Sequence, residues 1–241
     1  MNEVTIICCY NNSNQYDQLI SSLKKQSIGF ELMGIDNTEA KYKSCAKAFN
    51  DHIKKVVTPY VVFCHQDIEF TDGNTLSSFV ECIKSTRFGD IIGVAGRISK
   101  GGTVVSNILQ GDSKENPGKQ TLVERTECEV VDECFFGGYT DNFVKYPFDE
   151  SLCNNWHLYA VDRCLNARVM GYSVYICPIT LIHKSKGKMN SIYNRQFYLL
   201  SKKYSRDIDY LNTTCAYAST RFPFREIAFL KRAISMCLGR Y

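Results

Sequence analysis

The chain has 241 residues, of which 44% are hydrophobic and 22% are charged, and its formal net charge at pH 7 is +4. This composition excludes a disordered tail, and so small a net charge gives no argument for nucleic-acid binding. No apolar run approaches the roughly 18 residues of a membrane-spanning helix, so we expect a globular protein with a full hydrophobic core.

Twelve cysteines are scattered through apparent strands and helices, and no two of them form a CxxC pair. The first residues, Met1-Asn-Glu-Val4, lack the basic start and the small-residue cleavage site of a secretory signal. We therefore expect a cytoplasmic protein whose thiols are reduced and mostly buried.

The first hundred residues alternate between short apolar runs and helical patterns. The pattern predicts strands at 4–10, 30–35, 60–64 and 91–96, and helices at 15–26, 39–57 and 74–86. Strands and helices that alternate at this spacing indicate right-handed crossovers and a parallel sheet. Residues 1–100 are therefore expected to form a nucleotide-binding half.

The pattern weakens beyond residue 97, where glycines over 97–127 predict loops or a hairpin. The apolar pattern becomes regular again in a predicted strand that carries Asp132 and Glu133. Gly171 is the expected C-cap of a later helix. The last 50 residues are predicted to be helical and basic. The expected elements of this half are a strand over 129–138, a helix over 156–170, a strand over 172–177 and an apolar segment over 180–183.

The run from Tyr60 to Asp67 is an apolar strand that ends abruptly in His65-Gln-Asp67. Ligands of α/β sheets bind beyond the carboxyl ends of the strands, so His65 and Asp67 are candidate metal ligands. The alternative is a strand followed by an Asp-capped loop. Together with His183, the two residues could also hold a catalytic zinc, which keeps a metallohydrolase as another hypothesis.

A set of short motifs follows one another along the chain. They are Tyr10-Asn11, Ile35-Asp-Asn37, Ala48-Phe-Asn50, Val62-Phe-Cys-His-Gln-Asp67, Val94-Ala-Gly96, Val131-Asp-Glu-Cys-Phe-Phe136, Phe148-Asp-Glu150, Trp156-His-Leu-Tyr-Ala-Val-Asp162, Gly171-Tyr172 and Ile182-His-Lys-Ser185. In this order they resemble the family 2-like group of bacterial glycosyltransferases with the GT-A fold. The resemblance covers residues 4–187.

The resemblance implies an α/β fold with a central, mostly parallel sheet flanked by helices. It implies a GT-A domain over 1–187, with a nucleotide-binding half over 1–100 and an acceptor half over 101–187, and a helical, basic C-terminal extension over 188–241. The implied activity is metal-dependent, inverting transfer of a hexose from a nucleotide sugar, with a UDP-sugar favoured. The implied acceptor is a bacterial surface polysaccharide or a lipid-linked glycan.

The same resemblance assigns the donor site. It places Asp36 at the uracil or ribose and Tyr10 and Asn50 beside the nucleotide, although each could instead stabilise a turn, a loop or a helix. Where the family usually has Asp-x-Asp, this chain has His65-Gln-Asp67. Asp67 is thus the expected main ligand of Mn²⁺ or Mg²⁺, which neutralises the leaving diphosphate.

His65 and His183 are implied to be further metal or phosphate contacts, and imidazole beside carboxylate favours Mn²⁺ over Mg²⁺. Lys184, followed by Ser185 and Lys186, could hold phosphate oxygens when a loop at Gly187 closes.

An inverting transfer also needs a base for the acceptor hydroxyl. The usual base position of the family falls on Ala160, which leaves the base open. Asp162 is the leading candidate, and His157, Asp149 and Glu150 are the alternatives. Ala160 also keeps open a nucleotide-sugar-binding protein with weak or no catalysis. Separately, Trp156 could stack on a sugar ring of the acceptor.

Residues 222–241 predict an amphipathic helix. Its apolar face carries Ile227, Leu230, Ile234 and Leu238, and Arg225, Lys231 and Arg232 lie off that face. Such a helix can rest on an anionic membrane at the inner face, pack on its own domain, or pair with a second subunit in a homodimer.

Overall fold

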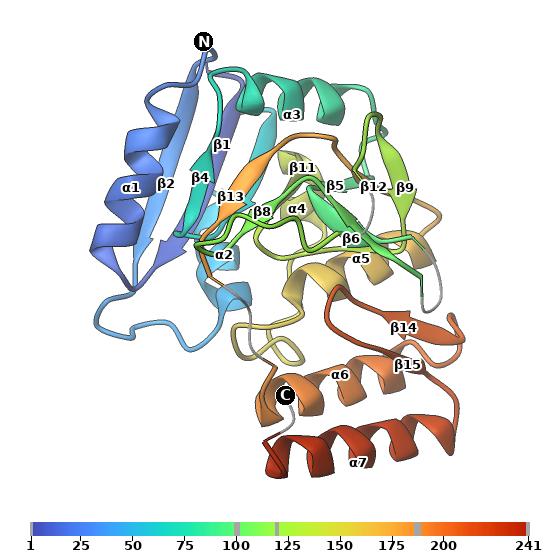
Figure 1. Cartoon of the computed structure of the whole chain (residues 1–241). Helices are drawn as coiled ribbons and strands as arrows, with labels where there is room; N and C mark the ends of the chain where they lie inside the picture. Colours follow the sequence, from blue (N-terminus) through green and yellow to red (C-terminus); the bar gives the residue numbers. More distant parts are fainter. Residues whose placement is uncertain (1, 99–101, 119–120, 186–188, 240–241) are drawn as a thin grey trace.

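The computed structural model describes residues 2–98, 102–118, 121–185 and 189–239. Within these ranges the largest sheet has seven strands (Figure 1). In spatial order they are β2 (Phe30–Asp36), β1 (Val4–Tyr10), β3 (Tyr60–Cys64), β11 (Phe135–Tyr139), β5 (Ile91–Gly93), β12 (Val174–Ile176) and β9 (Thr126–Cys128). Only β11 and β9 run against the others. The predicted α/β fold with a central, mostly parallel sheet is confirmed.

Helices cover both faces of this sheet. On one face, α1 (Ser13–Leu23) and α3 (Thr75–Lys84) share a core with Ile6 and Val62. On the other, α2 (Cys45–Ile53), α4 (Thr140–Lys145) and α5 (Tyr159–Val169) share a core with Ile7 and Phe63. Neighbouring strand residues point to opposite faces, so the apolar runs of β1 and β3 feed both cores.

Smaller sheets extend the central one at the carboxyl ends of its strands. One joins β4 (Ile68–Phe70), β13 (Leu181–His183) and β8 (Leu109–Gln110), and another joins β10 (Val130–Val131), β6 (Ala95–Arg97) and β7 (Val104–Ser106). In the first, His183 pairs with Ile68 in antiparallel register. This pairing brings the end of a late strand beside the loop that follows β3.

The C-terminal segment forms a layer below the sheet in Figure 1. It consists of α6 (Ser191–Lys203), the hairpin β14 (Tyr210–Asn212) and β15 (Tyr217–Ser219), and α7 (Phe224–Cys237). The guanidinium of Arg232 on α7 donates to Asn194 Oδ1 at 2.8 Å and lies 4.4 Å from the ring centroid of Phe197 on α6. Phe197 and Leu200 belong to the core that also contains α2 and α5.

Several predicted elements differ from the structure in the first half of the chain. The helix predicted over 39–57 begins only at Cys45, because the Ser44 hydroxyl caps it by accepting from Lys47 N at 3.3 Å. Ala40, with φ of +53°, cannot belong to a helix. The strand predicted over 91–96 is divided into β5 and β6, which lie in different sheets.

Two further predictions were wrong in detail. The strand predicted over 129–138 is divided into β10 and β11, and the chain leaves the sheet at Asp132-Glu-Cys134. The last 50 residues are not all helical, since they include the hairpin β14–β15. Propensity alone does not show this hairpin, which is stabilised by contact with the rest of the chain.

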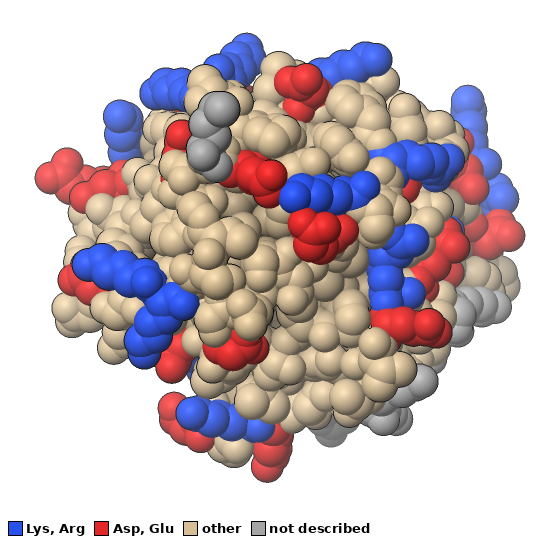
Figure 2. Space-filling model, turned by 90° about the horizontal axis from the view of Figure 1, so that it is seen from above, with Lys and Arg blue, Asp and Glu red and all other residues tan. Residues whose placement is uncertain are grey.

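All twelve cysteines are free thiols, and most of them are buried. Among the described residues no helix is both long enough and apolar enough to cross a lipid bilayer. On the face shown in Figure 2, acidic and basic side chains lie next to one another around an uncharged centre. That face therefore carries no basic patch of the kind that binds a phosphate backbone.

Candidate functional site

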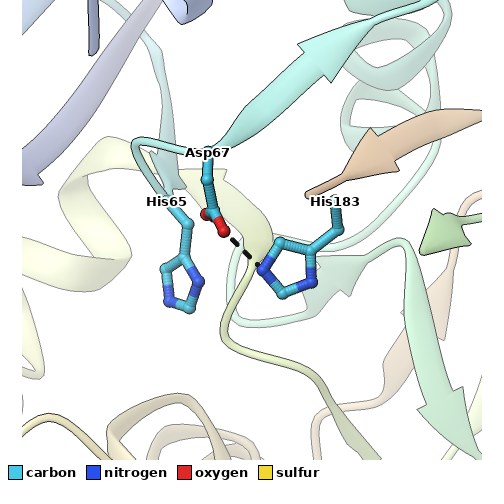
Figure 3. A group of neighbouring side chains, drawn as sticks. All are labelled: His65, Asp67 and His183. Carbon is cyan, nitrogen blue, oxygen red and sulfur yellow. Dashed lines mark ion pairs between the residues drawn. The ribbon is translucent and has the colours of Figure 1, made fainter. Parts of the chain in front are cut away.

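His65, Asp67 and His183 meet at the carboxyl ends of β3 and β13, with their side chains pointing toward one another (Figure 3). One ligand atom from each residue lies within 4.8 Å of the others. Asp67 Oδ1 is 3.5 Å from His183 Nε2. The three residues that the sequence singled out as candidate ligands are thus brought together.

Neighbouring groups fix the orientation of these ligands. The backbone N–H of His65 donates to Cys134 O at 2.9 Å, and His65 Nε2 lies 3.1 Å from the Tyr159 hydroxyl. The backbone N–H of Ser185 donates to Asp67 Oδ2 at 3.1 Å. Such hydrogen bonds restrict ligand rotation, which is what a metal site requires of its surroundings.

The electrostatics of the cluster suit a cation. Burial raises the pKa of Asp67, but the hydrogen bond and charge of His183 outweigh burial and hold this pKa below its usual range. Burial, helped by His183, lowers the pKa of His65 to about 4. At neutral pH the cluster therefore offers an anionic carboxylate and, at His65, a neutral imidazole. Burial lowers the pKa of His183, but the hydrogen bond and charge of Asp67 outweigh burial and raise it, so His183 must lose any proton it holds before it can bind an ion. Two imidazoles and one carboxylate fit Mn²⁺ better than Mg²⁺, which prefers oxygen ligands alone.

Two cavities meet at this cluster. The first, of about 330 Å³, lies beside β1, and the second, of about 410 Å³, lies beside β10. His65, Trp156 and Ser185 line both of them. Trp156, which is 40% exposed, is thus part of the wall between them. A ligand in either cavity would lie next to the metal-ligand cluster.

The first cavity has an aromatic and polar lining. The ring of Tyr10 stacks on Tyr16 with the centroids 4.0 Å apart, and Asn37 also lines the cavity. Asp36 is next to this lining but outside it. Its carboxylate accepts from Thr38 N at 2.9 Å, and this bond, with those from the hydroxyls of Thr38 and Tyr10, lowers the pKa of Asp36.

Gln66 was not assigned a role from the sequence, yet it organises this cavity. Its Oε1 accepts from the backbone N–H groups of Asn11 and Asn12, both at 2.9 Å, and its Nε2 donates to Asn11 Oδ1 at 2.9 Å. The middle residue of His65-Gln-Asp67 thus holds the loop after β1. A sequence reading gives no sign of a contact between residues 55 positions apart.

Several predicted site residues line neither cavity. Asn50 ties α2 to the segment before α5, because it bonds Phe148 O and N at 2.9 and 3.0 Å and Glu150 Oε1 at 2.9 Å. Lys184 Nζ contacts Gln18 Oε1 at 2.6 Å and Glu69 Oε2 at 3.1 Å. Lys186 and Gly187 of the predicted phosphate loop lie outside the described residues. The roles predicted for all of these remain predictions.

Asp162 and Asp149 form an ion-pair cluster with Lys203. The Lys203 ammonium lies 2.7 Å from Asp162 Oδ1 and 3.0 Å from Asp149 Oδ2, and the Tyr204 hydroxyl donates to Asp162 Oδ1 at 2.9 Å. Burial raises the pKa of Asp162 even though Lys203 opposes this effect. Ala160 is fully buried in the core.

The second cavity is lined by two acidic residues that were assigned no role from the sequence. Asp132 and Glu133 line it together with His157. Asp132 Oδ2 accepts from the Thr214 hydroxyl at 2.6 Å, and Oδ1 accepts from Cys134 N at 3.1 Å. The sequence feature that could have pointed to this part of the site is the presence of two acidic residues inside an apolar run.

The apolar face predicted for the C-terminal helix is exposed on α7. Phe224, Ile227, Leu230, Ile234 and Leu238 are between 44% and 62% exposed. The opposite face, with Arg232, packs on α6. An exposed apolar stripe of this kind on a surface helix is unusual.

Comparison with known proteins gives a family. A family model described as "Glycosyltransferase like family" matches residues 5–207. Among curated proteins, "ATP synthase subunits region ORF 6" of Fuscovulum blasticum is 23% identical over 211 residues, which covers 80% of this chain and 79% of that protein.

Solved structures share the fold. TarS from S. aureus is 14% identical with a TM-score of 0.56 and matches 87% of this chain, which spans only 40% of TarS. A mannosyltransferase from Pyrobaculum calidifontis, in complex with GDP-Man and Mn²⁺, is 11% identical with a TM-score of 0.58. That match covers 86% of this chain and 65% of the mannosyltransferase. GalNAc-T7 with UDP, GalNAc and Mn²⁺ is 8% identical with a TM-score of 0.59, over 86% of this chain and 51% of that protein.

Proposed function

This chain belongs to the glycosyltransferase-like family and has the GT-A fold, and from that premise we propose that it is a metal-dependent, inverting glycosyltransferase. The proposed donor is a nucleotide sugar, with a UDP-sugar favoured. The proposed acceptor is a bacterial surface polysaccharide or a lipid-linked glycan. One observation carries the proposal: the cluster of His65, Asp67 and His183 lies where the two cavities meet.

The first cavity suits the nucleotide diphosphate. The stacked rings of Tyr10 and Tyr16 offer an apolar surface to a base, and Asp36 beside them is an acceptor for uracil or ribose donors. The solved relatives that contain UDP or GDP-Man support a nucleotide-sugar donor. A donor placed here has its diphosphate directed toward Asp67.

Asp67, His65 and His183 would hold the cation, which when bound neutralises the charge that develops on the leaving diphosphate. The second cavity would hold the acceptor. With the donor in the first cavity and the acceptor in the second, the acceptor oxygen would approach the anomeric carbon from the side opposite the leaving group. A single displacement with that geometry inverts the anomeric configuration. The match to a glycosyltransferase-like family gives no support to the hypothesis of a zinc-dependent hydrolase.

Calorimetry of UDP binding with and without Mn²⁺ tests the donor half of the proposal. We expect Mn²⁺ to tighten UDP binding in the wild type and to have little effect in Asp67→Asn. Equal UDP affinity with and without the ion in the wild type would contradict the proposed site. Donor binding without sugar transfer to any of a panel of acceptors favours the alternative that Ala160 suggested, a sugar-nucleotide-binding protein.

We also propose that the exposed face of α7 rests on an anionic lipid surface at the cytoplasmic side of the membrane. Among the exposed residues of α7, Lys231 alone is charged, so this face is apolar with one cation and no acid. Exposed Phe222 and Phe224 lie at the start of the helix. Aromatic and basic side chains on one helical face suit the boundary between head groups and acyl chains.

The same C-terminal segment lines the second cavity through Met189 and Tyr193. Contact of α7 with a membrane would therefore hold the proposed acceptor site near lipid-linked glycans. This arrangement connects the membrane contact with the choice of acceptor.

A further inference from the structure

An inverting transfer needs a group that removes the proton of the acceptor hydroxyl, and neither expected position supplies one in the second cavity. Ala160 has no acidic group and is fully buried. The Asp162 carboxylate is held by Lys203 and Tyr204, and Asp162 is absent from the described residues that line the second cavity. For an acceptor bound in that cavity, the candidate bases that line it are His157, Asp132 and Glu133.

The acidic residues that do line the second cavity differ in how their oxygens are used. Both oxygens of Asp132 accept a hydrogen bond, one from Cys134 N and one from the Thr214 hydroxyl. By contrast, Oε1 of Glu133 is buried and has no hydrogen-bond partner among the described residues. A buried carboxyl oxygen without a donor has lost its contact with water and gained no hydrogen bond in return, which is unfavourable. Since this oxygen is not accessible to a water-sized atom in the structure, an acceptor hydroxyl in the cavity would supply the missing donor once the Glu133 side chain has moved to expose it.

We propose that Glu133 is the catalytic base of the transfer, a proposal that rests on the glycosyltransferase function proposed above. The acceptor hydroxyl donates to Glu133 Oε1 and gives up its proton to that oxygen. As the proton leaves, the acceptor oxygen forms a bond to the anomeric carbon, and the bond from that carbon to the diphosphate breaks. Its electron pair leaves with the nucleoside diphosphate, so atoms and charge balance.

The position of Glu133 is fixed by the start of α5. The backbone N–H groups of Leu158 and Tyr159 lie close enough to its carboxyl group to lower its pKa, and α5 has no side-chain cap at Leu158. The N–H groups at a helix start lack partners within the helix and attract anions. Glu133 therefore either serves only as the cap of α5, or lies beside α5 with its buried Oε1 left without a donor until the acceptor binds. The two roles predict different effects of the substitution Glu133→Gln.

The proton affinity of Glu133 agrees with the second role. Burial and the charge of Asp132 raise the pKa of Glu133 well above its usual value, although the N–H groups of α5 oppose this. The pKa of Asp132 is lowered, so neighbouring carboxyls differ in the way expected of acid and base partners. The titratable groups that face Glu133 are Asp132, Cys45, Cys153, Tyr159, Tyr193 and Cys215.

Glu133→Gln separates the two roles because glutamine keeps the shape and an oxygen acceptor for α5 but cannot take a proton. The assay mixes the protein with Mn²⁺ and a panel of UDP- and GDP-sugars, with water and simple sugars as acceptors, and measures release of the nucleotide. We expect about 100-fold or greater loss of kcat in Glu133→Gln. UDP binding in the presence of Mn²⁺ should stay unchanged. Glu127→Gln, on the exposed edge strand β9, is the matched control and should keep full turnover.

The pH dependence supplies an independent readout. Because the pKa of Glu133 is raised, kcat of the wild type should rise with pH as the carboxyl loses its proton, and Glu133→Gln should lose that rise. The stability of the folded state should change with pH in the opposite direction. A folded state that favours the neutral acid loses stability as pH rises above the unfolded-state value of 4.5. The melting temperature of Glu133→Gln should therefore exceed that of the wild type by a margin that grows with pH.

Each outcome decides between the readings. If Glu133→Gln turns over within a few-fold of the wild type, Glu133 is a cap and not the base. If His157→Gln loses turnover while Glu133→Gln keeps it, His157 is the base. A wild type that binds UDP with Mn²⁺ but releases nucleotide from no sugar of the panel overturns the proposed transferase activity, and the role of Glu133 with it. If the wild type fails to bind UDP at all, the proposed function itself has failed.

Discussion

Replacement of Asp67 by asparagine removes the carboxylate from the His65, Asp67 and His183 cluster and keeps its size. The amide oxygen of the introduced asparagine can still accept from Ser185 N, which in the wild type donates to Asp67 Oδ2 at 3.1 Å. The change therefore tests charge rather than packing. We expect Mn²⁺ to stabilise the wild type against heat and to have little effect on the variant.

The magnitude follows from binding to the folded state. Mn²⁺ at about 100 times its Kd stabilises the protein by about 2.7 kcal/mol. With about 2.1 cal/mol/K of unfolding entropy per residue, the 241-residue chain should melt about 5 °C higher. If loss of the carboxylate weakens ion binding about 100-fold, the same Mn²⁺ concentration stabilises the variant by about 0.4 kcal/mol, or about 1 °C.

Differential scanning fluorimetry at fixed ionic strength, with Mn²⁺ and with a chelator, measures both shifts. The baselines will differ, because the pKa of Asp67 is below its ordinary value of 3.8. Such a group stabilises the fold above pH 3.8 and loses this contribution as pH falls through its folded-state pKa, so the variant should start from a lower melting temperature at pH 7. The Mn²⁺-induced shift is therefore the quantity to compare.

Glu69→Gln is the matched control, because Glu69 lies two residues away on β4 and pairs with Lys184 at 3.1 Å, outside both cavities. It should keep the full response to Mn²⁺. If Asp67→Asn is stabilised by Mn²⁺ as much as the wild type, the ion does not bind this carboxylate, and the reasoning about the site is refuted.

Three more perturbations test other parts of the structure. Lys203→Met leaves the buried carboxylate of Asp162 without its cation, so the free energy of unfolding measured in urea should fall by about 2 kcal/mol; an unchanged value would mean that the ion pair contributes nothing. Trp156 is the single tryptophan and lines both cavities, so its fluorescence should change when UDP and Mn²⁺ are added, and a silent titration would place the nucleotide elsewhere. The double variant Leu230→Ser, Ile234→Ser should lose cosedimentation with vesicles rich in anionic lipid, whereas loss of self-association in ultracentrifugation instead would identify α7 as a dimer contact.

The sequence predicted the parts of the fold whose apolar pattern is local. Strands β1 and β3 are almost entirely apolar, and β2 is apolar apart from Glu31, Gly34 and Asp36; all three were found within about one residue of their bounds. The prediction of one strand over 129–138 missed the break between β10 and β11, because apolar residues continue on both sides of it. The acids Asp132 and Glu133 are the local sign of this break, and pairing with β6 on one side and with β3 on the other assigns the two halves to different sheets.

The candidate site shows the same limit. His65 and Asp67 were found because polar residues end an apolar strand, and His183 because it ends another. The partners that hold these ligands, such as Tyr159 and the backbone of Ser185, come from distant segments and leave no pattern in the sequence. Asp162 is a case where chemistry alone misleads, because Lys203, 41 positions later, binds the carboxylate.

The break between β10 and β11 connects fold and function. A continuous strand there would pair Val131 through Phe136 within one sheet and leave no place for two acids, since buried charge without a partner is costly. Instead the chain leaves the sheet at Asp132 and Glu133, and both side chains line the second cavity. A sequence that keeps two acids inside an apolar run gives up stability at that point. The melting behaviour expected of Glu133→Gln would show that loss directly, because removing the charge should stabilise the fold while it abolishes turnover.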